Sequence, residues 1–201
     1  MKQMNEMHED ICRSPWVLSD TVFMTIPGIR LKALQITAVA LMFCAPLFAQ
    51  TVPHTEAESL SGKKIVLPDA ASGKLAVLIV GFSHKSSTPM KEWAQRIDAD
   101  YRSNPGIIYF QVPVIASAPR MVRGMIMHGM KKDVPKDKYE TFAVVTRDEI
   151  AWKQAAGFDR PDDAYILLLD ATGNIRWKTS GTAEAHYTEL KTQIAQLATP
   201  K

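Results

Sequence analysis

Two nearly continuous apolar runs, residues 75–82 and 107–114, constrain the fold of this chain more than any other feature. Such runs are typical of strands that are buried on both faces of a sheet. Between them, apolar residues recur at helical spacing: Met90, Trp93, Ala94, Ile97 and Tyr101. A strand, a helix and a second strand in this order predict a parallel βαβ unit with a right-handed crossover.

The rest of the chain continues to alternate strands and helices. Further strands are predicted at 63–67, 141–146, 165–170 and 175–178, and further helices at 119–130, 148–156 and 183–197. The turn at 170–174 makes the last two strands an antiparallel hairpin. This order predicts an α/β fold with three layers, α/β/α, around a mixed central sheet. It is the thioredoxin-like arrangement, with a small strand-containing insertion near 133–160.

The N-terminal segment has the pattern of an export signal. The longest apolar run, 36–48, follows Arg30 and Lys32, and the chain turns polar at Gln50. A basic segment, a short apolar segment and a small residue at the exit are typical of a secretory signal peptide. The run is shorter than the roughly 20 residues that span a bilayer, so we expect cleavage, with an uncleaved membrane anchor as the alternative. Acidic residues near the N-terminus favour Met24 as the true start.

Cleavage after this signal would leave residues 50–201 in the periplasm or outside the cell. We expect 1–49 to be an N-terminal extension plus signal peptide, 50–62 to be a flexible lead-in and 63–198 to be the folded domain. Both cysteines, Cys12 and Cys44, precede residue 50. The exported domain therefore carries no thiol.

The charge balance excludes one class of partner. Lys and Arg number 24 against 21 Asp and Glu, a formal net charge of +3. Nucleic-acid-binding domains usually have a pI above about 9 with clustered basic residues, so no nucleic acid is expected. Two cysteines also rule out a disulfide framework and an all-cysteine metal site. We predict no cofactor.

The loop that carries the reaction centre in a thioredoxin-like fold lacks the required chemistry here. That centre lies at a helix N-terminus, where the dipole and free N–H groups stabilise a thiolate. Ser87-Thr88-Pro89-Met90 stands at the position of a Cys-x-Pro-Cys motif, with Ser87 for the attacking thiol and Met90 for the resolving one. A serine hydroxyl without a base is scarcely ionised at neutral pH, and a thioether forms no disulfide. The sequence therefore excludes dithiol exchange and thiol peroxidase activity and disfavours catalysis in general.

The same loop also contains His84, close to Ser86 and Ser87. A catalytic serine–histidine pair needs an orienting acid and an oxyanion hole, and the sequence supplies no such set. We expect the serines and Thr88 to cap the helix and His84 to be a loop residue. The six residues from His84 to Met90 other than Lys85 then form a vestigial active-site loop.

The predicted helix at 119–130 carries Met121, Met125 and His128 on one face. Thioethers and an imidazole suit Cu(I), which gives a copper-binding module in the periplasm as the alternative function. Flexible methionine side chains also fill gaps in apolar cores. The sequence favours the core interpretation and leaves the copper alternative open.

Basic side chains gather on and after this helix. The candidate partner-binding residues are Arg120, Arg123, Lys131, Lys132 and Lys136. Such a surface can dock an acidic partner or an anionic membrane, or it can be an ordinary solvated face. The sequence does not decide among these.

Several blocks of the chain resemble a known family. They are Pro-Arg-Met-Val-Arg at 119–123, Met-Lys-Lys-Asp-Val-Pro at 130–135, Tyr-Ile-Leu-Leu-Leu-Asp at 165–170, and Gly-Asn-Ile-Arg-Trp at 173–177 with Ser180 and Gly181. They resemble the mitochondrial ATP synthase assembly-factor family of thioredoxin-like proteins, and the resemblance covers most of 60–198. It implies a chaperone-like helper in assembling the membrane sector of the synthase, and it implies no catalytic residue set.

This chain departs from the family in its N-terminal signal, which looks bacterial and secretory rather than mitochondrial. Together, the resemblance and the residues predict a redox-inactive, non-catalytic binding or assembly module in the cell envelope. Its partner is expected to be a protein of the envelope, either free or associated with a membrane.

Overall fold

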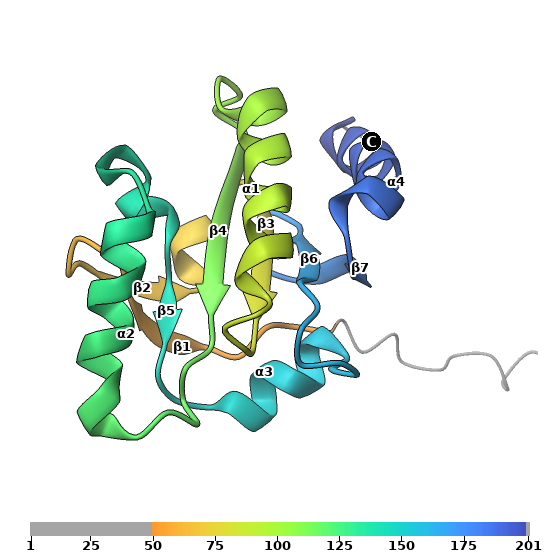
Figure 1. Ribbon diagram of the computed structural model, residues 1–201. Helices are drawn as coiled ribbons and strands as arrows, with labels where there is room; N and C mark the ends of the chain where they lie inside the picture. The colour runs from red at the N-terminus through yellow and green to blue at the C-terminus, as the bar shows by residue number, and fades with distance from the viewer. Residues whose placement is uncertain (1–49, 200–201) are drawn as a thin grey trace, which may run out of the picture. The chain divides into compact units, whose positions relative to one another are not determined.

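The computed structural model describes residues 50–199 (Figure 1). The predictions of a signal peptide and of a start at Met24 lie outside the described residues. Within residues 50–199, no helix combines the length and the apolar character that crossing a bilayer requires.

Four strands form the central sheet: β3 (Leu75–Gly81), β4 (Ile107–Pro113), β6 (Tyr165–Leu169) and β7 (Ile175–Ser180). Their order is β4-β3-β6-β7. Strand β4 runs parallel to β3, whereas β6 is antiparallel to β3 and β7 is antiparallel to β6. The predicted βαβ unit and the terminal hairpin are both confirmed, and the sheet is mixed.

Strand β3 lies between two apolar cores, as its continuous apolar run predicts. On one face, Val77 and Ile79 pack with Trp93 of helix α1 (Ser87–Tyr101) and Ile194 of helix α4 (Ala183–Ala198). Burying such a side chain completely contributes about 1.5–3 kcal/mol. Helices α1 and α4 therefore cover this face of the sheet (Figure 1).

The other face of β3 packs against a different set of elements. Leu78 and Val80 contact a core that includes Trp152 of helix α3 (Glu149–Ala156) and residues of a small second sheet. That sheet has the order β2-β1-β5 and is antiparallel throughout, with β1 (Thr55–Glu58), β2 (Lys64–Leu67) and β5 (Val144–Val145). Isolated bridges, Val114 to Val145 among them, join the end of β5 to the edge of β4. The three layers of an α/β fold are thus present.

The N-terminal part of the domain differs from the prediction. Residues 50–62 were expected to be a flexible lead-in, but they contain strand β1, which pairs with both β2 and β5. Thr55 and Ala57 of β1 point inward while Glu56 and Glu58 are exposed. Trp152 Nε1 donates a hydrogen bond to Thr55 Oγ1 at 3.3 Å, which explains how a polar side chain is buried there.

The insertion region also differs in detail. The strand predicted at 141–146 is reduced to the two residues of β5, and the residues before it form a 3-10 helix, η2 (Lys136–Thr141). Helix α2 (Arg120–Asp133) extends three residues beyond the predicted end near Met130 and has no buried residue. It lies over a small third cluster of Leu60, Phe142 and Val144.

Candidate functional site

The vestigial active-site loop lies between the end of β3 and the start of α1. Ser86 and Met90 are buried, whereas His84, Ser87 and Thr88 are exposed and Pro89 is half-buried. The prediction that Thr88 caps the helix is wrong, because α1 begins one residue earlier, at Ser87, and has no side-chain cap. Instead, Ser83 Oγ accepts a hydrogen bond from the backbone N–H of Ser86 at 3.2 Å.

Ser86, rather than Ser87, is the serine that meets Met90. Its Oγ donates to the carbonyl oxygen of Ser83 at 2.8 Å and lies 3.8 Å from Met90 Sδ. Ser87, which stands at the attacking position when the sequence is matched to a Cys-x-Pro-Cys motif, is exposed at the first residue of α1. The Ser86 hydroxyl proton is engaged with a carbonyl, so this side chain has no base to activate it as a nucleophile.

Glycine at position 81 allows this pair to pack against the end of β3. A Cβ at Gly81 would overlap Met90 Sδ and Ser86 Oγ and would lie 3.3 Å from Ser86 Cβ. Met90 and Ser86 therefore fill the space next to Gly81, whereas Ser87, the first residue of α1, is exposed.

No catalytic pair forms around His84 in the part of the chain that the structure describes. The backbone N–H of Ser87 donates to the carbonyl oxygen of His84 at 3.2 Å. No hydrogen bond found among residues 50–199 joins the His84 imidazole to the hydroxyl of Ser86 or Ser87. The polar contacts of the loop run to Asp162 instead, which accepts a hydrogen bond from Ser83 Oγ at 3.0 Å and an ion pair from Lys85 Nζ at 3.4 Å. These contacts fix the loop in place.

A charged cluster ties η2 to helix α1. Asp98 accepts hydrogen bonds from Lys138 and from Tyr109 at 3.1 Å. Burial alone would raise the pKa of Asp98, but the two hydrogen bonds outweigh it and hold that pKa below its ordinary value of 3.8. Burial and the neighbouring Asp98 charge raise the pKa of Tyr109 to about 12. The cluster is saturated and leaves no group free for acid–base chemistry, so its role is structural.

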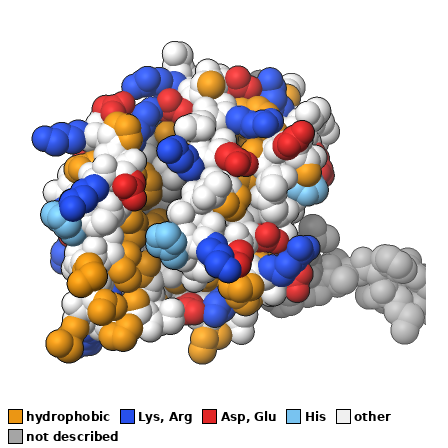
Figure 2. Space-filling view, in the orientation of Figure 1, with side chains coloured by type: hydrophobic (Ala, Val, Ile, Leu, Met, Phe, Trp, Pro, Cys, Tyr) orange, Lys and Arg blue, Asp and Glu red, His pale blue; other side chains and the backbone are white. Residues whose placement is uncertain are grey.

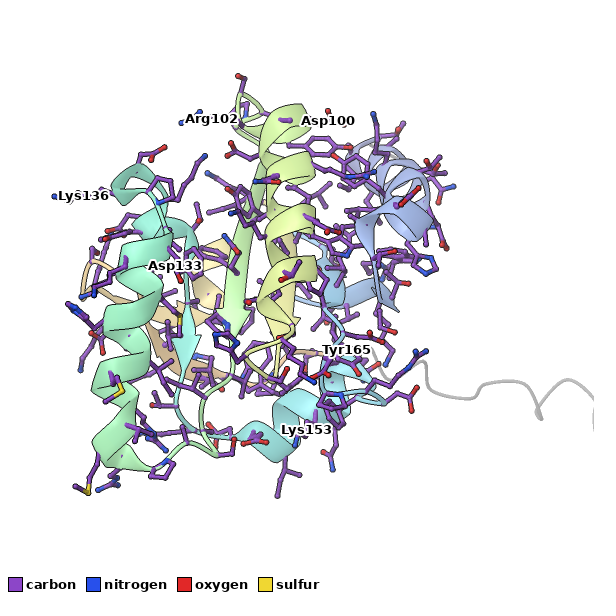
Figure 3. All side chains as sticks on the ribbon, viewed as in Figure 1. Asp100, Arg102, Asp133, Lys136, Lys153 and Tyr165 are labelled. Atoms are coloured by element: carbon purple, nitrogen blue, oxygen red, sulfur yellow. The ribbon has the colours of Figure 1, made fainter. Side chains whose placement is uncertain are left out.

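The five predicted partner-binding residues do not act alike. Arg123 donates from Nε to Ala118 O at 2.9 Å and from Nη2 to Ala116 O at 2.7 Å, so it holds the loop that enters α2. The other four are exposed and take part in none of the ion pairs found among residues 50–199. They are Arg120 at the start of α2, Lys131 and Lys132 at its end, and Lys136 in η2. Figure 3 labels Lys136.

A groove of about 440 Å³ runs beside α2, and we call it the α2 groove. Helix α2 supplies Arg123, Met127, His128 and Lys131 to its wall. The opposite wall contains residues that the sequence did not single out, among them Glu58, Ile115 and Val144. They come from β1, the segment after β4, and β5, so only the tertiary fold brings them together. The groove combines apolar walls with a mainly cationic rim.

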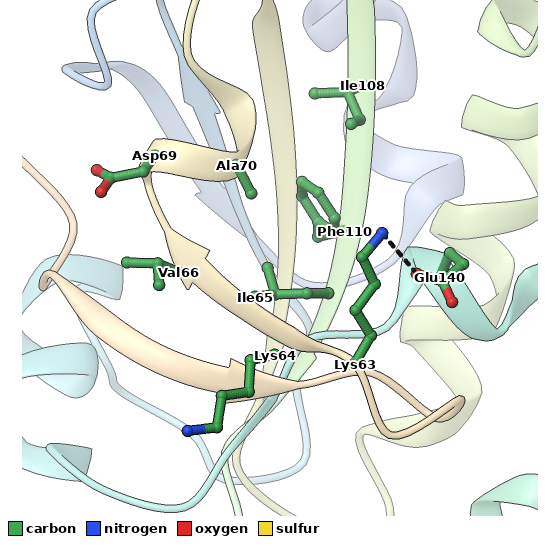
Figure 4. A pocket seen from close by; sticks show the side chains of 9 residues that line it. All are labelled: Lys63, Lys64, Ile65, Val66, Asp69, Ala70, Ile108, Phe110 and Glu140. Atoms are coloured by element: carbon green, nitrogen blue, oxygen red, sulfur yellow. Dashed lines mark ion pairs between the residues drawn. The ribbon is translucent and has the colours of Figure 1, made fainter.

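A second hollow of about 480 Å³ lies between strand β2 and the edge of β4. Ile65 and Phe110 form its apolar floor, and Lys63 and Glu140 form an ion pair of 3.8 Å at one side (Figure 4). We assign it no function.

The methionines of α2 divide into two groups. Met127 and Met130 pack against the small third cluster, as the core interpretation predicts. Met121 and Met125 do not, because their exposed fractions are 96% and 76%. The core interpretation is therefore wrong for these two residues.

The candidate copper ligands are not gathered around one point. Met121 and His128 lie about 10 Å apart along the helix axis at 1.5 Å per residue, so only neighbouring members of the set are one turn apart. Within residues 50–199, no group of three or more His, Cys, Asp or Glu side chains is placed to hold a metal ion.

Comparisons with known proteins agree with this geometry. The profile of the family described as ATP10 protein matches residues 47–196. No curated protein matches the chain.

Solved structures show the same fold at low sequence identity. The thioredoxin domain of a thiol-disulfide oxidoreductase from Bacteroides vulgatus matches with a TM-score of 0.51 and 17% identity, covering 72% of this chain and 96% of that one. BsSco, a member of the Sco family of cytochrome c oxidase assembly proteins, gives a TM-score of 0.53 at 11% identity, covering 77% and 96%. A SCO1/SenC family lipoprotein from Bacillus anthracis gives 0.51 at 14%, covering 76% and 97%. These matches establish the thioredoxin-like fold.

Proposed function

Because the chain belongs to the ATP10 protein family of ATP synthase assembly factors, we propose that it is a non-catalytic assembly module that works in the cell envelope by binding a protein. Membership in an assembly-factor family implies protein partners. Beyond family membership, we propose that the protein is located in the cell envelope, that it has no redox activity, and that it binds its partner through a particular surface.

The observation that carries the proposal is the closed Ser86–Met90 pair at the place of the reaction centre. Ser86 is fully buried and its hydroxyl is bonded to Ser83 O. Both cysteines of the chain precede residue 50. A fold without a thiolate at this helix N-terminus performs no thiol–disulfide exchange, so the domain acts through binding alone.

The envelope location is supported by the N-terminal sequence. Arg30 and Lys32 before the apolar run 36–48 form the pattern of an export signal. We propose that the mature protein is one thioredoxin-like domain that begins near Gln50. That domain includes β1 and is therefore longer at its N-terminus than the 63–198 expected from sequence.

The partner surface that the geometry supports best is the α2 groove. Lys131 lies on its rim, Lys132 follows, and neither takes part in an ion pair found among residues 50–199. Ile115, Met127 and Val144 supply apolar wall. An extended or helical protein segment with apolar and acidic side chains complements this combination.

Capture of envelope proteins by charge-reversed variants tests this proposal. We expect Lys131→Glu with Lys132→Glu to lose a specific captured protein that the unchanged chain retains. Lys74→Glu with Lys91→Glu is the matched control, because both lysines are exposed, lie away from the groove and give the same change in net charge. Arg123 is left unchanged, since its two bonds to backbone carbonyls make it part of the fold. Equal capture by both double variants would exclude the groove as the interface.

A further inference from the structure

We propose that the N-terminal ends of α2 and α3 form a lipid-contact tip that enters the surface of an anionic bilayer. The tip consists of Met121, Val122 and Met125 from α2 and Ile150 from α3. It is separate from the α2 groove, and the proposal does not depend on the identity of any protein partner.

The four tip residues are the large apolar side chains that stand exposed among residues 50–199. Their exposed fractions are 96% for Met121, 38% for Val122, 76% for Met125 and 75% for Ile150. Figure 2 shows apolar side chains gathered over the lower end of α2 and below α3. A soluble domain rarely exposes such a group of large apolar side chains without a binding role.

Hydrogen bonds hold the two helix starts in a fixed relation. The backbone N–H of Ile115, in the segment that leads into α2, donates to the carbonyl oxygen of Val145, four residues before α3, at 2.8 Å. The same loop is fixed from the other side by Arg123, which donates to Ala116 O and Ala118 O. The tip is therefore built on a rigid base, and Met121 and Ile150 project from it on neighbouring helix ends.

The charges around the tip favour anionic headgroups. Arg120 precedes Met121, and Arg147 lies three residues before Ile150; both are exposed and belong to no ion pair found among residues 50–199. Two carboxylates lie nearby. Glu149 forms an ion pair with Lys153 at 2.7 Å, so Asp148 is the only one of the two that has no ion pair among residues 50–199. Apolar side chains flanked by arginines are the composition of segments that rest in the interface of an anionic membrane.

The shape of the tip favours a bilayer over a folded protein. Met121 is almost wholly exposed, and neither hollow on the described surface includes a tip residue in its wall. A protein partner would need a recess cut to fit these projecting side chains, whereas a bilayer accepts any projecting apolar group. Lipid is therefore the occupant to which we commit.

Oxidation footprinting of the full chain tests the proposal directly. The chain is treated with chloramine-T alone, with phosphatidylcholine vesicles, and with vesicles of equal parts phosphatidylcholine and phosphatidylglycerol, and sulfoxide at each methionine is measured by mass spectrometry. We expect the anionic vesicles to slow oxidation of Met121 and Met125 by about fivefold or more, because the thioethers leave water. Met127 and Met130, which face the protein, are internal references and should keep their rates. Buried Met90 reports that the fold is intact.

Two charge-reversed variants make the test specific. Arg120→Glu should abolish most of the protection of Met121 and Met125, whereas Lys132→Glu, the same change at the far end of α2, should leave it. Equal oxidation rates with and without vesicles would overturn the proposal. So would protection that rises with protein concentration in the absence of vesicles, since that result would assign the tip to a second copy of the chain.

Discussion

Replacement of Gly81 by alanine tests whether the former reaction centre is closed by packing. The added Cβ would overlap Met90 Sδ and Ser86 Oγ, and both side chains are buried. Strand β3 is paired on both sides, with β4 and with β6, so its backbone cannot shift to make room. Inserting a methyl group into a packed core typically costs about 1–3 kcal/mol. For a domain of this size, that cost lowers the Tm by roughly 3–10 °C.

The matched control for this substitution is Gly124→Ala in helix α2, where a Cβ would meet nothing within 4 Å. Alanine is favoured over glycine in a helix interior by about 1 kcal/mol, so this variant should melt higher. Both would be measured by thermal unfolding and by urea titration. Met90→Ala alone should cost about 2–5 kcal/mol because it empties a buried site, but it should cost less in the Gly81→Ala background, where it also removes the overlapping Sδ. If Gly81→Ala is neutral and the two substitutions are additive, then the packing argument fails.

Two further results are expected. The pKa of Asp98 lies below its ordinary value of 3.8 in the folded state, so the ionised carboxylate stabilises the fold above pH 3.8, and this contribution is lost as the pH falls through the lowered pKa. The Tm of Asp98→Asn should therefore decline less steeply with acidification than the Tm of the unchanged chain, and a parallel decline would contradict this assignment. The exported protein should have the intact mass of residues 50–201, whereas a mass that retains residues before Met24 would exclude the proposed start.

The central βαβ unit could be predicted because its signals are local. The apolar run at 75–82 is continuous since β3 has a core on each face, where Val77 and Leu78 point to opposite sides. The helical spacing from Met90 to Ile97 likewise marks the buried stripe of α1. In these elements, the residues that are apolar in the sequence are the ones that pack into a core, so the pattern alone was enough to predict them.

Strand β1 escaped prediction because its inward residues are small or polar. Thr55 and Ala57 alternate with Glu56 and Glu58, which gives a weak apolar signal. Thr55 and Ala57 are buried by the small sheet and by Trp152, which stands nearly one hundred positions after Thr55 in the chain. Tertiary contacts of this kind override local propensity.

The sequence also could not predict which serine of the candidate site faces the protein interior. Whether Ser86 or Ser87 faces inward depends on how the chain turns after Gly81, and the bond from Ser86 N–H to Ser83 Oγ sets that turn. For helix α2 the sequence predicted too much burial rather than too little. Its apolar spacing is typical of a core helix, yet none of its residues is buried. An amphipathic pattern identifies an apolar face but not what covers it.

Insulin reduction is the most direct test of the central claim that this thioredoxin-like domain works without redox chemistry. The full chain would be assayed with Cys12→Ser and Cys44→Ser, so that no thiol remains anywhere in it. With dithiothreitol as the electron donor, we predict that insulin precipitates no faster than in the protein-free blank. Precipitation that accelerates in proportion to the amount of this variant would contradict the account.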